Sequence, residues 1–130
     1  MAYRAYVGDG CTTVKVKVAE AGQTLDDDVA RIAAVRSAQW SAGVHHPAIR
    51  IDANGAWTVD EAVVAIRELD GVSGGLEYVE QPCRTLEELA ELRGRISVPI
   101  AADESIRTAS DPIRAAQMSA ADIVVVKVPP

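Results

Sequence analysis

Residues 12–18 read TTVKVKV, and this short stretch decides how the rest of the chain is interpreted. It alternates with a period of two, so Lys15 and Lys17 share one face of a strand with Thr13, while three valines share the other face. A helix is expected next, over residues 24–40, because three aspartates occupy its first turn, where negative charge suits the helix dipole. The stretch therefore predicts a strand that is followed directly by a helix.

The same strand–helix unit recurs along the chain. Further strands are expected over residues 48–52, 76–80, 98–103 and 123–128. Further helices are expected over residues 58–69, 85–94 and 110–118, the first two opening on capping boxes, Thr58 with Glu61 and Thr85 with Glu88. This alternation is typical of parallel strands that are joined by crossover helices, so the predicted fold class is α/β with a parallel sheet.

Length and composition limit what the chain can be. Its 130 residues suit one domain or part of a larger one, whereas a complete (β/α)8 barrel needs about 250. The 48% of hydrophobic residues exclude a disordered tail, and the absence of Phe leaves a core of aliphatic residues. The net charge of −6 and the lack of a basic stripe argue against a nucleic-acid partner.

The sequence also indicates a cellular setting. It holds no apolar run of the roughly 20 residues that a membrane helix needs, and residues 1–10 lack the apolar centre of a signal peptide. Its two cysteines, Cys11 and Cys83, do not make a disulfide framework, so we expect a reducing, cytoplasmic location without a membrane partner. Cys83 has no histidine at a recognisable partner position, which favours a structural thiol over a nucleophile.

Ionisable residues stand where the predicted strands end. They are Lys17, Asp52, Glu80, Asp103 and Lys127, each about one βα unit after the one before. In parallel α/β folds, sites form at the carboxyl ends of the strands, so these groups should converge. Any one of them could be a polar residue at the point where a strand reaches solvent, but charges that gather need partners or a metal. The set as a whole therefore predicts a site.

The chemistry of that set points to a metal and a proton-transfer group. Three carboxylates repel one another unless a cation lies between them, and ligation by oxygen alone favours Mg²⁺. A partly desolvated lysine near another cation has a lowered pKa and can act as a base near neutral pH. We therefore expect both lysines at this site to have lowered pKa values.

Five strings in the chain resemble a known family. VKVKV, IDANGAW, EYVEQP, AADES and the final VVKV are similar to the barrel domain of the enolase superfamily. More narrowly, they resemble the o-succinylbenzoate synthases of menaquinone biosynthesis, of the type that carries LEYVEQPC and PIAADESI. The resemblance covers nearly the whole chain from about Cys11. It implies a partial (β/α) barrel whose strands correspond to the second to sixth of the complete barrel.

The resemblance also assigns roles to residues. It implies that Asp52, Glu80 and Asp103 bind Mg²⁺, that Lys17 is the general base and acid, that Lys127 lies on the opposite face of the substrate, and that Lys15 and Asn54 support them. Arg50 follows from its position, since it shares the face of its strand with Asp52. It is expected either to support a carboxylate or to make a simple inward salt bridge.

The implied reaction is the Mg²⁺-dependent dehydration of a succinyl-hydroxycyclohexadiene carboxylate. Lys17 would remove the proton α to the carboxylate and return it to the departing hydroxyl, so that water leaves from the same face. Mg²⁺ on the carboxylate would stabilise the enediolate, and Lys127 could lie over the ring as a cation–π partner. A proton-exchanging racemase of N-acylamino acids or an epimerase of dipeptides, within the same superfamily, is an alternative that these motifs permit equally.

A third interpretation is a non-catalytic fragment. The resemblance treats residues 1–130 as one truncated barrel domain, without the capping domain and the remaining strands, and residues 1–10 do not resemble the first strand of the family. Five strands leave two open sheet edges, and the β-branched strand over residues 123–128 would lie at one of them. The isolated chain is therefore expected to self-associate and to have little activity as a monomer.

Overall fold

A computed structural model describes residues 10–128 and contains one five-stranded parallel sheet. The strands are β1 (Thr13–Lys17), β2 (Ala48–Asp52), β3 (Tyr78–Glu80), β4 (Ile100–Ala102) and β5 (Ile123–Val124), and they pair in chain order. The predicted α/β class and parallel sheet are confirmed. The predictions made for residues 1–10 fall almost entirely outside the described part of the chain.

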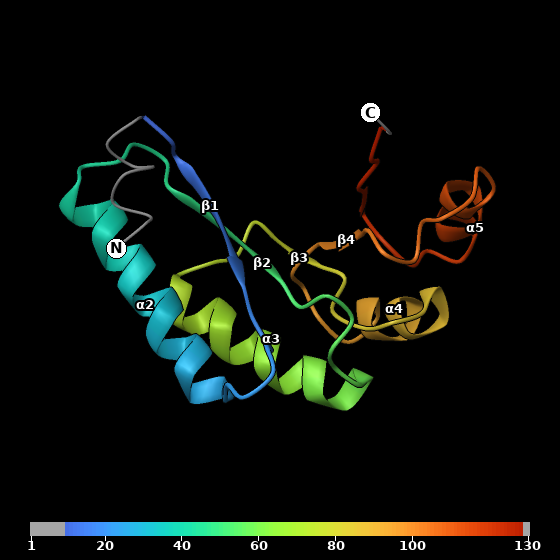
Figure 1. The fold of residues 1–130 in the computed structure, drawn as a ribbon, viewed down its shortest axis with the longest axis horizontal. Helices are drawn as coiled ribbons and strands as arrows, with labels where there is room; N and C mark the ends of the chain where they lie inside the picture. Colours follow the sequence, from blue (N-terminus) through green and yellow to red (C-terminus); the bar gives the residue numbers. More distant parts are fainter. Residues whose placement is uncertain (1–9, 129–130) are drawn as a thin grey trace.

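Each connection between strands contains a helix. The helices are α2 (Leu25–Ser41), α3 (Val59–Ser73), α4 (Leu86–Arg93) and α5 (Asp111–Gln117). Figure 1 shows α2, α3 and α4 along the same side of the sheet, with α5 beyond β4. This arrangement leaves the other side of β1, β2 and β3 free of helices among the described residues, as a barrel interior requires.

Threonine caps start three of these helices. Thr24 with Asp27 and Thr85 with Glu88 form complete capping boxes, in which the threonine hydroxyl and the acidic side chain each accept a backbone N–H. Thr58 accepts the N–H of Glu61, so the predicted start of α3 is confirmed, although only this half of the box is formed. Each such cap stabilises its helix by about 1 kcal/mol.

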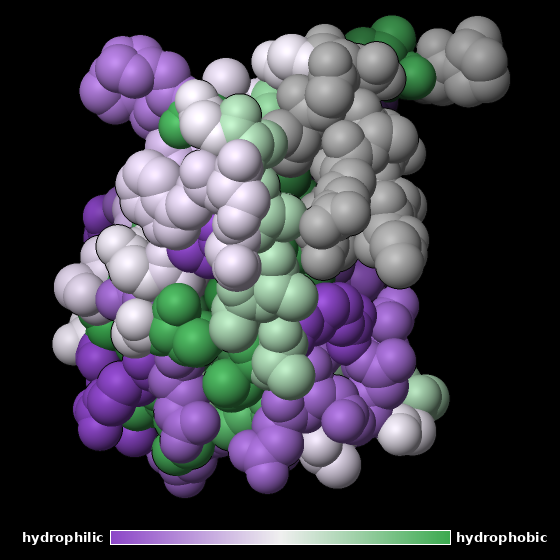
Figure 2. Space-filling model, turned by 90° about the vertical axis from the view of Figure 1, so that its left-hand side faces the viewer, coloured by the Kyte–Doolittle hydropathy of each residue, from purple (hydrophilic) through white to green (hydrophobic). Residues whose placement is uncertain are grey.

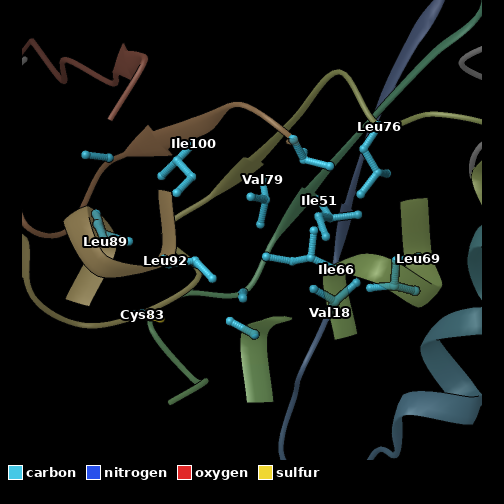
Figure 3. Close-up of a cluster of buried hydrophobic side chains, with 14 of the residues drawn as sticks. Val18, Ile51, Ile66, Leu69, Leu76, Val79, Cys83, Leu89, Leu92 and Ile100 are labelled. Carbon is cyan, nitrogen blue, oxygen red and sulfur yellow. The ribbon is translucent and has the colours of Figure 1, made fainter. Parts of the chain in front are cut away.

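The core lies between the sheet and its helices and is aliphatic, as the composition predicted. Figure 3 shows strand residues Ile51, Val79 and Ile100 facing Ile66 and Leu69 of α3 and Leu89 and Leu92 of α4. All of these side chains are fully buried. Burial of an aliphatic side chain contributes about 1.5–3 kcal/mol, so this layer fixes how the strand ends are arranged.

The surface over α2 has a mixed character. On the face that lies to the left in Figure 1, hydrophobic and hydrophilic side chains are interspersed (Figure 2). Within residues 10–128, no helix is both long enough and apolar enough to span a membrane.

Four elements have an end that differs by two or more residues from the sequence prediction: β3 and β4 begin two residues later than expected, β5 ends four residues earlier, and α3 ends four residues later. The last strand was expected over residues 123–128, but β5 ends at Val124 because its neighbour β4 has only three residues; Val125 donates the final ladder-like bond, to the carbonyl of Ala102 (2.8 Å). β-branched residues favour a strand only where a partner is present. In contrast, α3 continues four residues past Leu69 and ends at Gly74, whose φ of +75° suits glycine.

Candidate active site

The candidate site lies at the carboxyl ends of four neighbouring strands, β1 to β4. Parallel pairing places Lys17 beside Asp52, and Asp52 beside Glu80. Asp103 follows β4 directly, on the next strand along the sheet. Because the core packs the strands behind them, the carboxylates of Asp52, Glu80 and Asp103 are buried, although all three are ionisable. Such burial has to be offset by partners.

Lysines provide those partners. The Lys17 ammonium lies 2.5 Å from Oδ2 of Asp52, and the Lys15 ammonium lies 3.0 Å from Oε2 of Glu80 and 3.7 Å from Asp52. Lys127 reaches back to Asp103 with a separation of 3.0 Å, although its side chain is 74% exposed. The structure therefore joins each of the five strand-end residues to this site, while their catalytic and metal-binding roles stay predictions.

Asn54 holds Asp52 and Lys17 in place. Its backbone N–H donates to Oδ1 of Asp52 (3.0 Å), and its side-chain oxygen accepts from Lys17 (3.2 Å). The backbone of Asn54 has a φ of +49°, a left-handed conformation that asparagine tolerates better than most residues. The turn after β2 therefore directs the Asn54 side chain back onto the strand ends. Asn54 is one of the residues to which the family resemblance assigns a supporting role.

The distribution of lysine in the chain is uneven. There are only three lysines, and every one of them is paired with a carboxylate of this site. The other ten basic residues are arginines, and none of the described arginines forms an ion pair with Asp52, Glu80 or Asp103. A lysine can lose its proton, whereas an arginine stays charged at any physiological pH. The site thus contains the cations that can transfer a proton.

The carboxylates also form a group that fits a divalent cation. Asp52, Glu80 and Glu104 each present one oxygen within 4.8 Å of the others. One oxygen of Glu104, Oε1, is buried and has no hydrogen-bond partner in the described part of the chain. An all-oxygen set of this kind suits Mg²⁺. Asp103 lies next to this group, and its assignment as the third ligand stays a prediction.

The pKa values of Asp103 and Glu104 move in opposite directions. Burial, the hydrogen bond with Asp103 and the charges of Asp103 and Asp52 raise the pKa of Glu104 above its ordinary value. Burial would also raise the pKa of Asp103, but hydrogen bonds with Lys127 and Glu104 and the charge of Lys127 outweigh it and lower that pKa. Asp103 is therefore the stronger acid of the pair, and it is the pKa of Glu104 that burial and the neighbouring carboxylates raise.

The lysines do not behave as the sequence analysis expected. A hydrogen bond to Glu80 raises the pKa of Lys15, and a hydrogen bond to Asp103 raises the pKa of Lys127. The expectation of a lowered pKa concerned Lys17 and Lys127, and it is wrong for Lys127 because this ammonium donates directly to a carboxylate, which stabilises the charged form. The pKa of Lys15, for which no direction was expected, is raised for the same reason.

Arg50 takes the second of the two roles expected for it. Its guanidinium makes two hydrogen bonds to Glu77, of 3.0 and 3.2 Å, and lies 4.8 Å from the ring centre of Tyr78. In the described part of the chain it pairs with Glu77 and not with a site carboxylate. Arg50 is therefore a salt-bridge residue two positions before Asp52 on β2, and a role in supporting a metal ligand stays a prediction.

Cys83 is placed where a nucleophile would not be. Its side chain is fully buried in the core, and burial, together with the charges of nearby glutamates, raises the pKa of the thiol to about 12. A thiol with such a pKa is protonated at neutral pH and unreactive. The structural interpretation of Cys83 therefore agrees with the structure.

The sequence analysis missed two residues that the structure places at the site. Glu104 directly follows Asp103, and Gln81 directly follows Glu80, so both lie one position beyond the strand-end residues that were considered. Both belong to the quoted strings EYVEQP and AADES, and a second polar residue immediately after a strand-end carboxylate was the available signal.

Comparison with known proteins shows the family. The family model described as "Enolase C-terminal domain-like" matches residues 1–130. Among curated proteins, the o-succinylbenzoate synthase of Thermobifida fusca is 59% identical over 129 residues, and that of Mycolicibacterium smegmatis is 58% identical over 121 residues. These matches cover 99% and 93% of this chain, but only 39% and 35% of the relatives' lengths.

Solved structures agree with this result. The L-Ala-D/L-Glu epimerase from Bacillus subtilis superposes with a TM-score of 0.82 at 34% identity, over 95% of this chain and 33% of that one. The dipeptide epimerase from Enterococcus faecalis gives 0.79 at 32% identity, over 95% and 34%. The five strands are thus part of a (β/α) barrel, as the sequence predicted. The chain belongs to the enolase C-terminal domain-like family.

Proposed function

We propose that this chain is the catalytic barrel segment of an o-succinylbenzoate synthase, which removes water from a cyclic hydroxy-carboxylate in menaquinone biosynthesis. The observation that carries the proposal is the confinement of all three lysines to a buried carboxylate cluster. Identities of 58–59% to two synthases support the choice of reaction. The substrate would be the succinyl-hydroxycyclohexadiene carboxylate that the resemblance implies.

Asp52, Glu80 and Asp103 would hold Mg²⁺, and Glu104 lies in the carboxylate group that it forms with Asp52 and Glu80. When bound, Mg²⁺ supplies the positive charge that stabilises negative charge building on the substrate carboxylate. The carboxylates are buried and aligned by the strand register, so little reorganisation is needed during the reaction.

Lys17 would carry the proton. Its Nζ lies at the end of β1, held by Asp52 and by the Asn54 oxygen. As a neutral amine it would take the proton from the carbon α to the carboxylate, and as an ammonium it would return that proton to the leaving hydroxyl. The carbon–hydrogen and carbon–oxygen bonds break, a ring double bond forms, and water departs. The ring becomes aromatic, which drives the elimination.

Lys127 approaches from the far side of the cluster. It is exposed and comes from the segment after β5, whereas Lys17 comes from β1 at the other edge of the sheet. We propose that it lies against the substrate ring and stabilises the developing charge as a cation–π partner.

A chimera tests this proposal. The 130 residues would replace the matching segment of the Thermobifida fusca synthase, to which they are 59% identical. The chimera should form o-succinylbenzoate and stop doing so in EDTA, and the same chimera with Lys17→Ala should be inactive. A folded chimera without Mg²⁺-dependent dehydration would contradict the proposal.

Epimerisation is the second candidate. The observation that favours it is the superposition on two dipeptide-type epimerases, with TM-scores of 0.82 and 0.79. Lysines that approach from opposite edges of the sheet could each serve one face of a substrate and exchange its α-proton. Incubation of the chimera with an L-Ala-Glu dipeptide or an N-acylamino acid in D₂O separates the two candidates: α-deuteration without water loss would favour epimerisation.

The proposal includes a cytoplasmic setting. Both cysteines are free thiols, Cys11 exposed and Cys83 buried, which agrees with a reducing compartment.

A further inference from the structure

Gln81 is a fully buried polar side chain that the proposed reaction does not use. It follows Glu80 directly and is completely inaccessible to solvent. Its backbone has a φ of +39°, a left-handed conformation that is strained for a residue with a long side chain. Strain of this kind persists only where the surrounding structure holds it in place, and it clusters at functional sites.

The carboxamide of Gln81 joins two loops of the site. Its Oε1 accepts the backbone N–H of Asp103 (2.8 Å) and both the backbone N–H (3.3 Å) and hydroxyl (3.1 Å) of Ser105. Its Nε2 donates to the carbonyls of Cys83 (2.8 Å) and Arg84 (3.4 Å). One side chain therefore links the loop after β3 to the loop that carries Asp103.

The backbone of Gln81 adds a third loop. Its carbonyl accepts the N–H of Gly55 (2.7 Å), in the turn that follows Asp52, and its own N–H donates to Ala101 of β4 (2.8 Å). The loops behind Asp52, Glu80 and Asp103 thus meet at one residue. A change in the Gln81 side chain would remove its bond to Asp103 while leaving the backbone bonds to Gly55 and Ala101 available.

We propose that Gln81 is a positioning residue that sets the affinity of the site for a divalent cation by fixing Asp103 relative to Glu80. This inference rests on the metal site of the proposed function. The carboxamide touches neither the cation nor the substrate; it acts through the main chain of Asp103. Partners that orient metal ligands in this way typically change metal affinity by about 10–100-fold when they are removed.

The chain contains a matched control in Gln39. This residue is also fully buried, and its Nε2 also donates to two backbone carbonyls, those of Ala48 (3.0 Å) and Thr12 (3.4 Å). It lies at the opposite end of the strands, where β1 and β2 begin. Loss of its amide should therefore weaken the fold without reaching the carboxylates.

The test compares Gln81→Met with Gln39→Met in the 130-residue chain. Methionine has a similar length and flexibility but forms no comparable hydrogen bonds. Mn²⁺ serves as the probe, and its dissociation constant is measured by electron paramagnetic resonance at a temperature at which circular dichroism shows each protein fully folded. Gln81→Asn is a second variant, because asparagine suits the left-handed backbone yet is too short to link both loops.

Gln81→Met, or Gln81→Asn if the methionine variant does not fold, should bind Mn²⁺ about 10–100-fold more weakly than the wild type, and Gln39→Met should bind it within about twofold of the wild type. Equal Mn²⁺ affinity of the wild type and the Gln81 variant would overturn the positioning role and leave the metal site standing. Equal weakening in the Gln39 and Gln81 variants would overturn it too, since it would show general loosening. Absence of Mn²⁺ binding by the folded wild type would overturn the metal site and, with it, this inference.

Discussion

The two ends of the sheet bury polar groups in opposite ways. At the amino end, Arg36 donates to the carbonyls of Pro47 (3.0 Å), Ser73 (2.5 Å) and Gly75 (3.3 Å), and Gln39 donates to those at the starts of β1 and β2. At the carboxyl end, three acidic side chains crowd within 4.8 Å, and one oxygen of Glu104 has no partner among the described residues.

The difference distinguishes buried polar groups that stabilise the fold from buried charged groups that serve a site. The amino end pairs cationic and amide donors with neutral carbonyls, which satisfies each group and closes the end of the core. The carboxyl end gathers like charges that only lysines and a further cation can balance. In (β/α) barrels the carboxyl face is where catalysis occurs, and the amino face serves stability.

Among exchanges of one basic residue for another, we expect the largest effect, a loss of turnover, at the carboxyl end of the sheet. In the chimera, Lys17→Arg keeps the positive charge beside Asp52 but removes a group that can give up its proton. We expect turnover to fall by about 10²–10⁴-fold, as for the loss of a general base, with Mn²⁺ affinity and the melting temperature little changed. Steady-state kinetics, Mn²⁺ titration and thermal denaturation of the same preparation measure these three quantities.

Lys17→Ala provides the comparison for that variant. If Lys17 acts only as a charge, the arginine variant should retain most of the activity and the alanine variant should lose it. If Lys17 transfers the proton, both variants should be equally poor. Turnover of Lys17→Arg within tenfold of the wild type would therefore refute the role of Lys17 as a base.

At the amino end of the sheet, replacing an arginine with a lysine should change the stability of the fold rather than turnover. Arg36→Lys keeps the charge but loses the planar fork that reaches three carbonyls at once. Of the three residues that carry these carbonyls only Ser73 is buried, and a buried carbonyl without a donor costs about 1–3 kcal/mol, so the free energy of unfolding should fall by about that amount. Urea denaturation followed by circular dichroism measures this free energy. An unchanged midpoint would show that the guanidinium fork of Arg36 does not stabilise the amino end of the sheet.

The smallest expected effect concerns Glu104. Burial, together with the neighbouring carboxylates of Asp103 and Asp52, raises its pKa above the ordinary value of 4.5, so the folded chain holds this proton more tightly than the unfolded chain does. Its contribution to stability is therefore lost as the pH rises from about 4.5 through the raised pKa. In EDTA, Glu104→Gln should stabilise the chain above that pH range by less than about 1 kcal/mol, since the group is partly exposed, and should have no effect below it.

Thermal denaturation in EDTA across pH 4–8 tests this prediction. Gln is neutral at every pH and resembles the protonated glutamic acid, so the two curves should meet at the acid end and separate above it. A variant that is less stable than the wild type at neutral pH would mean that the charge of Glu104 is needed by Lys127 or Asn54 rather than opposed by its neighbours.

Much of the fold could be predicted because local signals agree with tertiary contacts. The β2 strand was predicted with its correct bounds, and its first four residues, AIRI, alternate between a partly buried and a buried face. The last strand was predicted too long, because six β-branched or charged residues in a row cannot reveal that the neighbouring strand provides partners for only the first few. Strand length depends on pairing, which a single segment does not encode.

The site could be predicted where it follows from strand ends, and less well where it depends on loops. Five strand-end positions located Lys17, Asp52 and Glu80 in one cluster. The roles of Gln81 and Glu104 could not be found in the same way, because they depend on how two loops fold back against each other. The direction of the lysine pKa values likewise required the actual contacts with carboxylates.

A crystal of the chain soaked with Mn²⁺ and measured at the manganese absorption edge tests most directly whether the carboxyl end of the sheet is a metal site. We predict one strong anomalous peak at about 2.0–2.2 Å from oxygens of Asp52, Glu80 and Asp103, in line with the short bonds of hard divalent cations to carboxylates. A peak that replaces Asp103 with Glu104 would correct the third ligand. The absence of a peak between these carboxylates at saturating Mn²⁺, or a peak only at the amino end of the strands, would contradict the division of the sheet into a structural end and a catalytic end.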